Sequence, residues 1–190
     1  QVVIVPIWQD ENEDEVRDYA EDVYEELDAE GFRVELDDRP HRNPGYKFNE
    51  WELKGVPVRI EIGPDEVEAD ELTGVHRDTG EEERFDREDV VAHVREDLDA
   101  MQERLLQAQT EFQEANVREA ETQEEIVSLI EEHGGYVTAK WCGKEACEEP
   151  VKDAAAADIV MVPLKDENVE GACAVCGDDA TEIAYFAKNY

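Results

Sequence analysis

The N-terminal half of the chain alternates strand-like with helix-like segments, and this alternation most constrains the fold. Residues 2–8 form a continuous apolar run of strand length, as expected for a strand buried on both faces. Asp10 and Glu13 form a capping box, after which apolar residues recur at helical spacing as far as Gly31. Residues 32–36 then alternate as a second strand. The pattern predicts helices packed on a sheet.

Two further segments extend the predicted sheet. Residues 43–45 (Asn-Pro-Gly) predict a turn, and a short amphipathic helix follows and ends at Gly55. Residues 58–62 alternate apolar with charged side chains, which predicts a strand with one buried face. Residues 72–77 and 83–85 predict a hairpin turning at Asp78-Thr79-Gly80. Strand–helix–strand–helix–strand followed by a hairpin implies an α/β fold with a mixed sheet.

A long helix is predicted to begin at Arg87 and to end near Ala120. Its apolar residues are spaced three and four apart: Val91, Val94, Leu98, Met101, Leu105, Ala108, Phe112 and Ala115. This spacing fits a coiled-coil seam. It also fits a helix that lies across its own sheet and then spans to a second domain. The second interpretation is favoured, because two of these residues are Ala and few basic residues flank the row.

A second unit is predicted to start at Thr122, an N-cap with Glu125 three residues later. Residues 136–141, 159–164 and 183–187 are predicted strands, and residues 148–157 a short helix. This is a small α+β domain with a thin apolar core. The predicted domains are therefore 1–121 and 122–190.

Four cysteines form two pairs in the second unit, Cys142-x4-Cys147 and Cys173-x2-Cys176. The glycine after Cys176 is typical of a knuckle turn that brings backbone N–H groups towards the sulfurs. Four thiolates favour tetrahedral Zn²⁺ in a closed structural site. The alternative is four buried reduced cysteines. A thioredoxin-like redox site is disfavoured, since the Cys-x-x-Cys does not open a helix of such a unit.

Other side chains with catalytic potential give no pattern. The four histidines are scattered and are predicted to lie at the surface or at helix ends: His41, His76, His93 and His133. No phosphate-binding glycine loop or nucleophile elbow occurs in the sequence. No catalytic residue is therefore predicted.

The chain carries a formal net charge of −35. Acidic residues occur along every predicted helix, which favours a solvated acidic surface over an acidic partner-binding face. Such a surface suits a cytoplasm with molar salt, where the Debye length is about 3 Å. No apolar run approaches the roughly 20 residues of a membrane span, and no signal peptide opens the sequence. A cytoplasmic protein without membrane contact is predicted.

One basic island interrupts the acidic sequence. Residues 39–59 contain five basic and two acidic residues. Within and beside this island, residues 44–64 (PGYKFNEWELKGVPVRIEIGP) closely resemble the anticodon-binding domain of archaeal/eukaryotic-type prolyl-tRNA synthetases of a haloarchaeal kind. The resemblance extends to residues 2–7 (VVIVPI), 134–137 (GGYV), 141–143 (WCG) and 184–190 (AYFAKNY).

The resemblance implies the five-stranded mixed sheet with three helices of a class IIa anticodon-binding domain, followed by a small α+β zinc-binding domain. Some members of the family lack the cysteines; this sequence has all four. It also implies that the proline anticodon of tRNA(Pro), with its two guanines, is the target. The resembled family ends in a similar tyrosine that packs towards the catalytic domain, which suggests this role for Tyr190.

Side chains of the basic island could read such a target. Arg and Lys can donate to guanine O6 and N7, and carboxylates can accept from base amino groups. The predicted nucleic-acid-binding residues are Arg39, Lys47, Glu52, Lys54, Arg59 and Glu61. For Arg59 and Glu61 the alternative is a salt bridge on a solvated face.

The function predicted is that of the tRNA-binding C-terminal portion of a prolyl-tRNA synthetase. The sequence starts at Gln1 in a strand and lacks the class II motifs that hold ATP, so we expect a fragment that is inactive alone. ATP would bind only in the missing catalytic domain, and the full enzyme would be a homodimer. The alternative is a free-standing acidic zinc-binding adaptor for protein interactions. A threonyl or glycyl relative is a more distant possibility.

Overall fold

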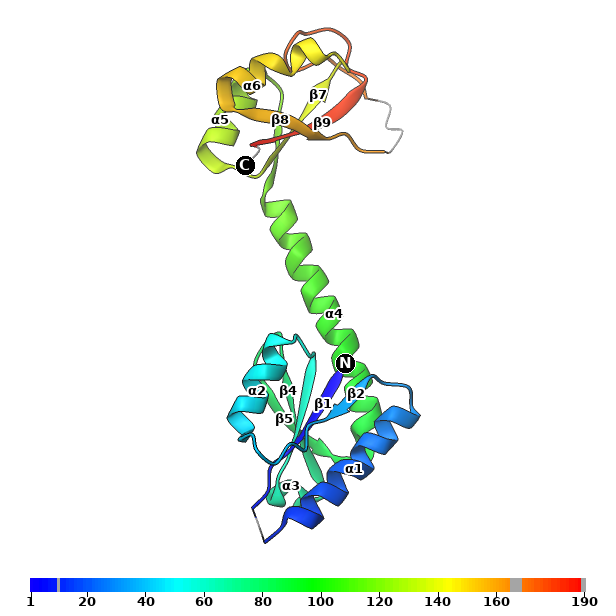
Figure 1. The fold of residues 1–190 in the computed structure, drawn as a ribbon. Helices are drawn as coiled ribbons and strands as arrows, with labels where there is room; N and C mark the ends of the chain where they lie inside the picture. Colours follow the sequence, from blue (N-terminus) through cyan, green and yellow to red (C-terminus); the bar gives the residue numbers. More distant parts are fainter. Residues whose placement is uncertain (10, 165–168, 189–190) are drawn as a thin grey trace. The chain divides into compact units, whose positions relative to one another are not determined.

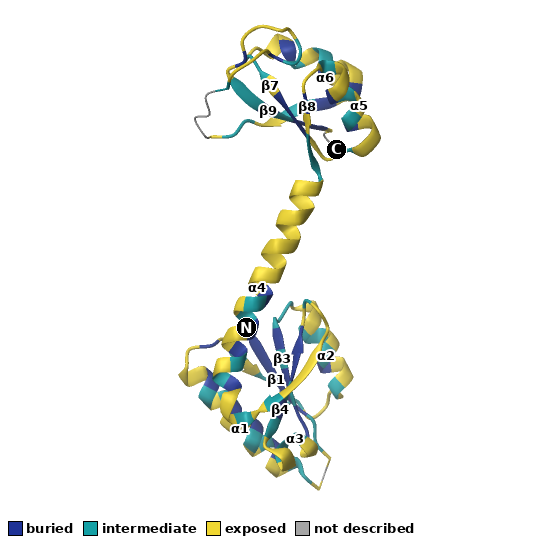
Figure 2. Ribbon diagram, turned by 180° about the vertical axis from the view of Figure 1, so that it is seen from behind, coloured by how far each residue is buried: buried dark blue, intermediate teal, exposed yellow. Residues whose placement is uncertain are grey.

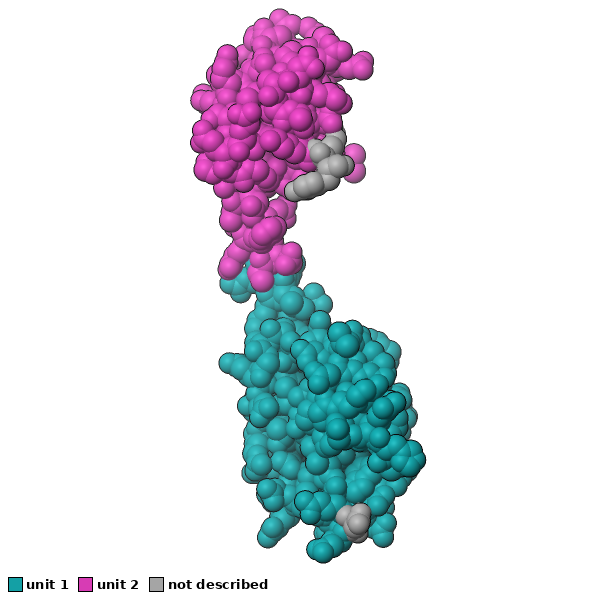
Figure 3. Space-filling model, turned by 60° about the vertical axis from the view of Figure 1, so that its left-hand side comes forward, with its two compact units in different colours: residues 1–107 teal, residues 108–190 magenta. Residues whose placement is uncertain are grey.

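The computed structural model describes residues 1–9, 11–164 and 169–188. The chain divides into two compact units, residues 1–107 and 108–190 (Figure 3). The division falls within helix α4 (Val90–Ala115). In the described part of the chain, no helix is both long and apolar enough to cross a membrane.

Unit 1 is built on a five-stranded mixed sheet in the order β2-β1-β3-β4-β5 (Figure 1). The central strands β1 (Val2–Pro6) and β3 (Val58–Ile62) are parallel to each other, and β2 (Val34–Leu36) is parallel to β1. The hairpin strands β4 (Glu71–His76) and β5 (Glu82–Asp86) complete the sheet in antiparallel order. Every residue of β1 is buried, as the continuous apolar run predicted (Figure 2).

The two faces of this sheet differ in what covers them. One face packs against α1 (Glu13–Ala29) and the start of α4, which contribute Val16, Val23, Val90 and Val94 to the core. The other face carries Val3, Arg59, Val75 and Glu82 in one row across four strands. Helix α2 (Pro44–Leu53) lies over this second face, with Phe48 against Arg59. The alternation of residues 58–62 therefore separates core from charge as predicted.

Some boundaries differ from the sequence analysis. Asn43 caps α2 through its side chain, so Pro44 and Gly45 form the first turn of the helix instead of a separate turn. Helix α3 (Pro64–Ala69) was not predicted, because its six residues show no apolar period. Its start is set by Pro64 and by Glu66, whose carboxylate accepts the Gly63 N–H at 2.9 Å. Asp10, the predicted cap of α1, lies outside the described residues.

The long helix ends at Ala115, and the predicted end near Ala120 is wrong. Residues 117–120 form β6 (Val117–Ala120), which pairs with β7 of the second sheet. Asn116 ends the helix. Its side-chain Nδ2 donates to the Phe112 carbonyl, and its own carbonyl accepts the Tyr136 N–H at 2.8 Å. Gly135 permits this approach at φ +74°, since an added Cβ would lie 2.5 Å from the Asn116 oxygen.

Unit 2 contains a four-stranded sheet in the order β6-β7-β9-β8. It comprises β7 (Tyr136–Trp141), β8 (Ala157–Met161) and β9 (Glu182–Lys188), with helices α5 (Gln123–His133) and α6 (Glu149–Ala155). Thr122 caps α5 as predicted, accepting the Glu125 N–H at 3.2 Å. Strand β6 adds an edge to this sheet that the sequence analysis had assigned to helix. The predicted fold class, an α/β unit followed by a small α+β unit, is confirmed.

Candidate nucleic-acid interface and cysteine cluster

The base of α2 is organised around Asp37, which follows β2. Its carboxylate accepts hydrogen bonds from Arg39 Nε and Nη2, each at 2.7 Å, and from Trp51 Nε1 at 2.7 Å. Burial alone would raise the pKa of this carboxyl. The bonds from Arg39 and Trp51, with the charge of Lys47, instead lower its pKa to about 2. Asp37 is therefore an anion at neutral pH and connects the end of β2 to Trp51 of α2.

Lys47 lies beneath α2 and not on its exposed face. Its side chain is 3% exposed, and Nζ donates to the Asp37 carbonyl at 2.8 Å, with the carboxylate 3.9 Å away. Burial lowers its pKa, and Asp37 opposes this shift. The predicted contact of Lys47 with nucleic acid remains a prediction, but its ammonium is used inside the protein in this conformation.

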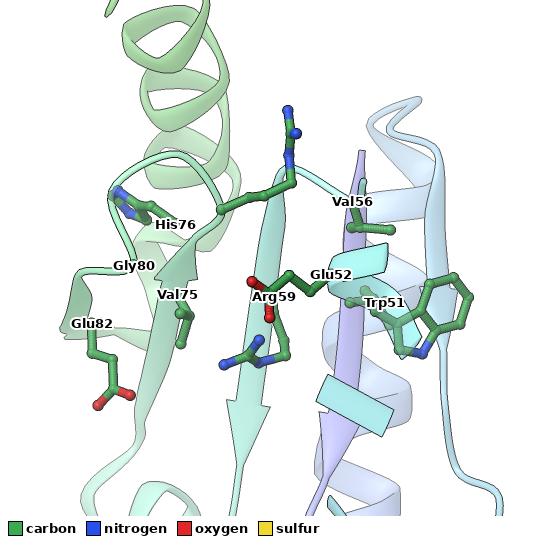
Figure 4. A pocket seen from close by; sticks show the side chains of 10 residues that line it. Trp51, Glu52, Val56, Arg59, Val75, His76, Gly80 and Glu82 are labelled. Carbon is green, nitrogen blue, oxygen red and sulfur yellow. The ribbon is translucent and has the colours of Figure 1, made fainter. Parts of the chain in front are cut away.

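A pocket of about 180 Å³ lies where the end of α2 meets the sheet (Figure 4). Trp51 and Glu52 line it from α2, and Val3, Arg59, Val75 and Glu82 line it from the row across the sheet. The hairpin turn closes it with His76, Arg77 and Gly80. The pocket thus combines an aromatic ring, a guanidinium and carboxylates. These are groups that stack on a planar base and bond to its edge.

Arg59 is held in place before any ligand arrives. Its Nε and Nη2 lie 2.9 and 2.8 Å from the same oxygen of Glu61, and its guanidinium stacks 4.2 Å from the Phe48 ring centre. The side chains of Arg59 and Glu61 are 19% and 18% exposed. The salt bridge that the sequence analysis held as the alternative is therefore present. Among the described residues, no carboxylate other than that of Glu61 lies within ion-pair distance of this guanidinium.

Two other predicted residues lie at the rim. Lys54 is half exposed, 3.3 Å from Glu50 and 3.8 Å from the Trp51 ring centre. Arg39 also bonds Glu50, at 2.6 Å, which lowers the pKa of that carboxyl. The basic island is thus largely neutralised by Asp37, Glu50 and Glu61. Tyr190, the remaining predicted contact, lies outside the described residues.

Two exposed arginines that border this surface, Arg42 and Arg77, have no carboxylate within ion-pair distance among the described residues. Arg42 stacks on Tyr46 at 4.4 Å and borders an open groove of about 430 Å³ with Arg39 and His41 at the start of α2. Arg77 lines the pocket at the other end. The sequence analysis did not choose either residue. For Arg77 the available signal was its place in the hairpin turn, outside the basic island.

The four cysteines of unit 2 come together in space. Cys142 follows β7, Cys147 precedes α6, and Cys173 and Cys176 lie in the loop before β9. The Cys142 sulfur is 3.6 Å from that of Cys147 and 3.7 Å from that of Cys176, and all four sulfurs lie within 4.8 Å of one another. Four sulfurs at about 2.3 Å from one Zn²⁺ would be about 3.8 Å apart. The cluster therefore has the dimensions of a tetrahedral thiolate site.

The surroundings of the sulfurs also suit a cation. Burial raises the pKa of the Cys173 thiol, but backbone N–H groups of Cys176 and Val175 outweigh it and lower the pKa to about 7. The knuckle closes with the Gly177 N–H on the Cys173 carbonyl at 3.0 Å, at a φ of +78° for Gly177. Burial raises the pKa of Cys147, which is 5% exposed. A bound cation would offset that burial by stabilising the thiolate.

His41 and His133 are exposed, as predicted. His93 lies in the first turn of α4, a helix end as predicted, although its side chain is only 16% exposed against Phe85. The prediction is wrong for His76, which ends β4 and is 8% exposed. His76 and His93 both face Asp97, at 3.1 and 3.4 Å. Sequence spacing could not reveal this, because the contact depends on how the β4–β5 hairpin packs against α4.

Comparison with known proteins follows the same division of the chain. The family model "Anticodon binding domain" matches residues 1–97, and the model "Prolyl-tRNA synthetase, C-terminal" matches residues 123–190. Similar curated proteins are the "Proline--tRNA ligase" of Haloarcula marismortui, 57% identical over 192 residues, and that of Halorubrum lacusprofundi, 55% over 196. The same-named protein of Thermococcus kodakarensis is 40% identical over 194 residues.

Each alignment includes the whole of this chain but only about 40% of the relative. The chain thus spans less than half the length of these relatives. The first family match covers the five-stranded sheet of unit 1, and the second covers most of the four-stranded sheet of unit 2. The chain belongs to the anticodon-binding domain family and carries, after it, the C-terminal domain of prolyl-tRNA synthetases.

Proposed function

We propose that this chain is the tRNA-recognising C-terminal part of a prolyl-tRNA synthetase. Unit 1 binds the anticodon of tRNA(Pro), and a catalytic domain outside this chain joins proline to the tRNA with ATP. The observation that carries the proposal is the pair of family matches, supported by relatives named proline–tRNA ligases that align with the whole chain. In the full enzyme we propose a cytoplasmic homodimer, with the functional domain boundary at residues 121–122.

The proposed anticodon surface is the face of the sheet covered by α2. The pocket at the end of α2 offers Arg59 to guanine O6 or N7, Glu52 to a base amino group, and Trp51 for stacking. Glu61, which accepts a hydrogen bond from Arg59, is proposed as a further acceptor for a base amino group. Arg39 and Lys54, which both pair with Glu50, contribute positive charge at the edge of this surface. We assign Lys47 a supporting part in which it fixes α2 through Asp37. Arg42 and Arg77 join the surface as donors to phosphate or base.

The charge of the chain decides what kind of contact can give affinity. A net charge of −35 repels a polyanion, and molar salt screens what attraction the arginines provide. Contacts that survive are short-ranged: bidentate hydrogen bonds and base stacking. A good bidentate pair contributes about 1–3 kcal/mol of discrimination. We therefore expect this surface to discriminate between anticodon bases while its overall affinity for tRNA stays modest.

We propose Zn²⁺ as the structural ion of the four-cysteine cluster. The sulfur spacing of 3.6–3.7 Å supports a tetrahedral ion, and four thiolates leave no open position for substrate. The ion would join the end of β7, the start of α6 and the loop before β9. Its part in the function is to hold unit 2 together.

Substitution of Arg59 tests the proposed surface. Arg59→Ala should weaken binding of tRNA(Pro) by about tenfold or more, corresponding to one lost bidentate contact. Arg59→Lys keeps the charge but loses the fork and should be nearly as weak. Filter binding in molar KCl measures the effect, with circular dichroism confirming the fold.

The matched control is Arg95→Ala. Arg95 lies on α4, across the sheet from the pocket, and pairs with Glu30 at 3.6 Å. Its loss removes the same charge without touching the proposed surface, so binding should change less than twofold or so. Equal losses of affinity in Arg59→Ala and Arg95→Ala, for cognate and non-cognate tRNA alike, would show that Arg59 contributes only non-specific electrostatic attraction.

A further inference from the structure

A second group of metal-ligand side chains lies in unit 1, away from the cysteines. His76 ends β4, Glu83 lies on β5, and His93 and Asp97 are one helical turn apart on α4. Ligand atoms of His76, Glu83 and His93 all lie within 4.8 Å of one another. The Asp97 Oδ2 is 3.1 Å from His76 Nε2 and 3.4 Å from His93 Nε2, and the Glu83 Oε2 is 4.0 Å from His93 Nε2.

Three of these ligand atoms are buried without a hydrogen-bond partner. They are His76 Nε2, His93 Nε2 and Asp97 Oδ2, in the part of the chain that the structure describes. His76 and Asp97 are each 8% exposed. The atoms are close, yet their directions fail the geometry of a hydrogen bond to one another. Buried polar atoms are nearly always satisfied, so three such atoms around one point indicate a missing shared partner.

The spacing of these atoms matches ligands of one small cation. Zn–N bonds are about 2.0–2.1 Å and Zn–O bonds about 2.0–2.2 Å. Two ligands at a tetrahedral angle are then about 3.3–3.5 Å apart. Of the two contacts of Asp97, the one at 3.4 Å lies within this range and the one at 3.1 Å lies just below it. Glu83, at 4.0 Å from His93, needs only a small movement of an exposed side chain. Imidazole nitrogens favour transition ions over Mg²⁺ or Ca²⁺.

The neighbouring residues hold the ligands in place. The His93 ring stacks on Phe85 at 3.7 Å and 16°, and Gly74 leaves room for this stack, since an added Cβ would lie 3.1 Å from the Phe85 ring. Arg104 of α4 pairs with Asp78 of the hairpin turn through two bonds, at 2.6 and 3.0 Å. The hairpin and α4 are therefore fixed relative to each other independently of any ion.

We propose that His76, His93 and Asp97, with Glu83 at the mouth, bind a divalent transition-metal ion such as Zn²⁺. The ion fastens the β4–β5 hairpin to α4. His76 and Arg77 also line the pocket below α2. An ion that fixes His76 therefore also positions this wall of the pocket. The site is separate from the four cysteines and does not depend on the proposed function of the chain.

Metal content of the 190-residue chain tests the site. After the chain is stripped with a chelator and reloaded with Zn²⁺ or Co²⁺, we expect about two ions per chain. His93→Gln should retain about one, held by the cysteines. Cys173→Ser should retain about one, whose Co²⁺ form lacks the thiolate charge-transfer absorption. His133→Gln removes an exposed histidine of unit 2 and should keep about two.

Glu83→Gln provides a variant that leaves the buried atoms intact. Its side chain is 58% exposed, and its loss should weaken Zn²⁺ binding at the histidine site by about tenfold or more. Glu82→Gln, the adjacent strand residue on the opposite face, is the control and should leave affinity unchanged. A wild-type chain that binds one ion, through thiolates alone, would overturn the proposal. So would a second ion whose affinity is unaffected by His93→Gln and Glu83→Gln.

Discussion

Removal of the metal from the cysteine cluster should unfold unit 2 and leave unit 1 folded. The core of unit 2 has ten buried apolar residues among those described, and five of them are alanines. That of unit 1 has thirteen, of which only Ala20 is an alanine. Alanine buries little area, so unit 2 gains less from the hydrophobic effect. Structural Zn²⁺ contributes on the order of 10 kcal/mol to folding, which would dominate its stability.

Hydrogen exchange measures the two units separately. With chelator, or in Cys173→Ser, amides of β7 and β9 should lose their protection, while those of β1 and β3 keep it. Lys144→Gln is the matched control, because Lys144 lies beside the sulfurs and pairs with Asp178 at the surface but is not a ligand. Its effect should stay within about 0.5 kcal/mol. Full protection of β7 in strong chelator would contradict a structural metal.

Asp37→Asn should destabilise unit 1 by about 3–5 kcal/mol at neutral pH. The substitution keeps the shape of Asp37 but removes the anion beside Lys47, whose side chain is 3% exposed. A buried charge that has lost its partner costs about this much. Urea unfolding of unit 1 measures the change. Asp38→Asn is the control: Asp38 is 43% exposed and pairs with Arg17 at the surface, so its loss should cost less than about 1 kcal/mol.

The same carboxylate predicts a pH dependence. Its folded pKa, about 2, lies below the ordinary value of 3.8. A lowered carboxyl pKa gives stability that is present above about pH 4 and is lost as the pH falls through 2. The amount is about 2 kcal/mol, and the wild-type minus Asp37→Asn difference should shrink by this much in that window. Asp37→Asn with Lys47→Met should recover stability, since the unpaired charge is gone. A single Asp37→Asn as mild as Asp38→Asn would disprove this account of α2.

Local sequence pattern was enough to predict most of the fold. The apolar run of β1, the alternation of β3 and the cap at Thr122 each depend on neighbouring residues, so their spacing specifies them. The long helix was placed correctly but extended too far. Its end depends on the pairing of Asn116 with the distant Tyr136, which no local pattern records.

The same distinction holds for the sites. Two closely spaced cysteine pairs predict a thiolate cluster, and the structure brings all four cysteines together. From the basic island, in contrast, the sequence predicted hydrogen-bond donors but not the acceptors within the protein that they contact. Asp37 lies just outside the island and takes up Arg39 and Lys47, so part of the predicted surface is internal support. The histidine group was missed because its ligands come from three elements, β4, β5 and α4, whose packing against one another no local pattern records.

Binding of the chain to tRNA(Pro) with altered anticodons tests the central claim most directly. In molar KCl, exchange of either anticodon guanine should reduce affinity by about tenfold or more, since each removes a set of edge contacts. A base-pair exchange in the acceptor stem should have little effect. The loss on guanine exchange should be much smaller in Arg59→Ala than in the wild type. Equal affinity of the wild-type chain for tRNA(Pro) and for both anticodon variants would contradict anticodon recognition by this chain.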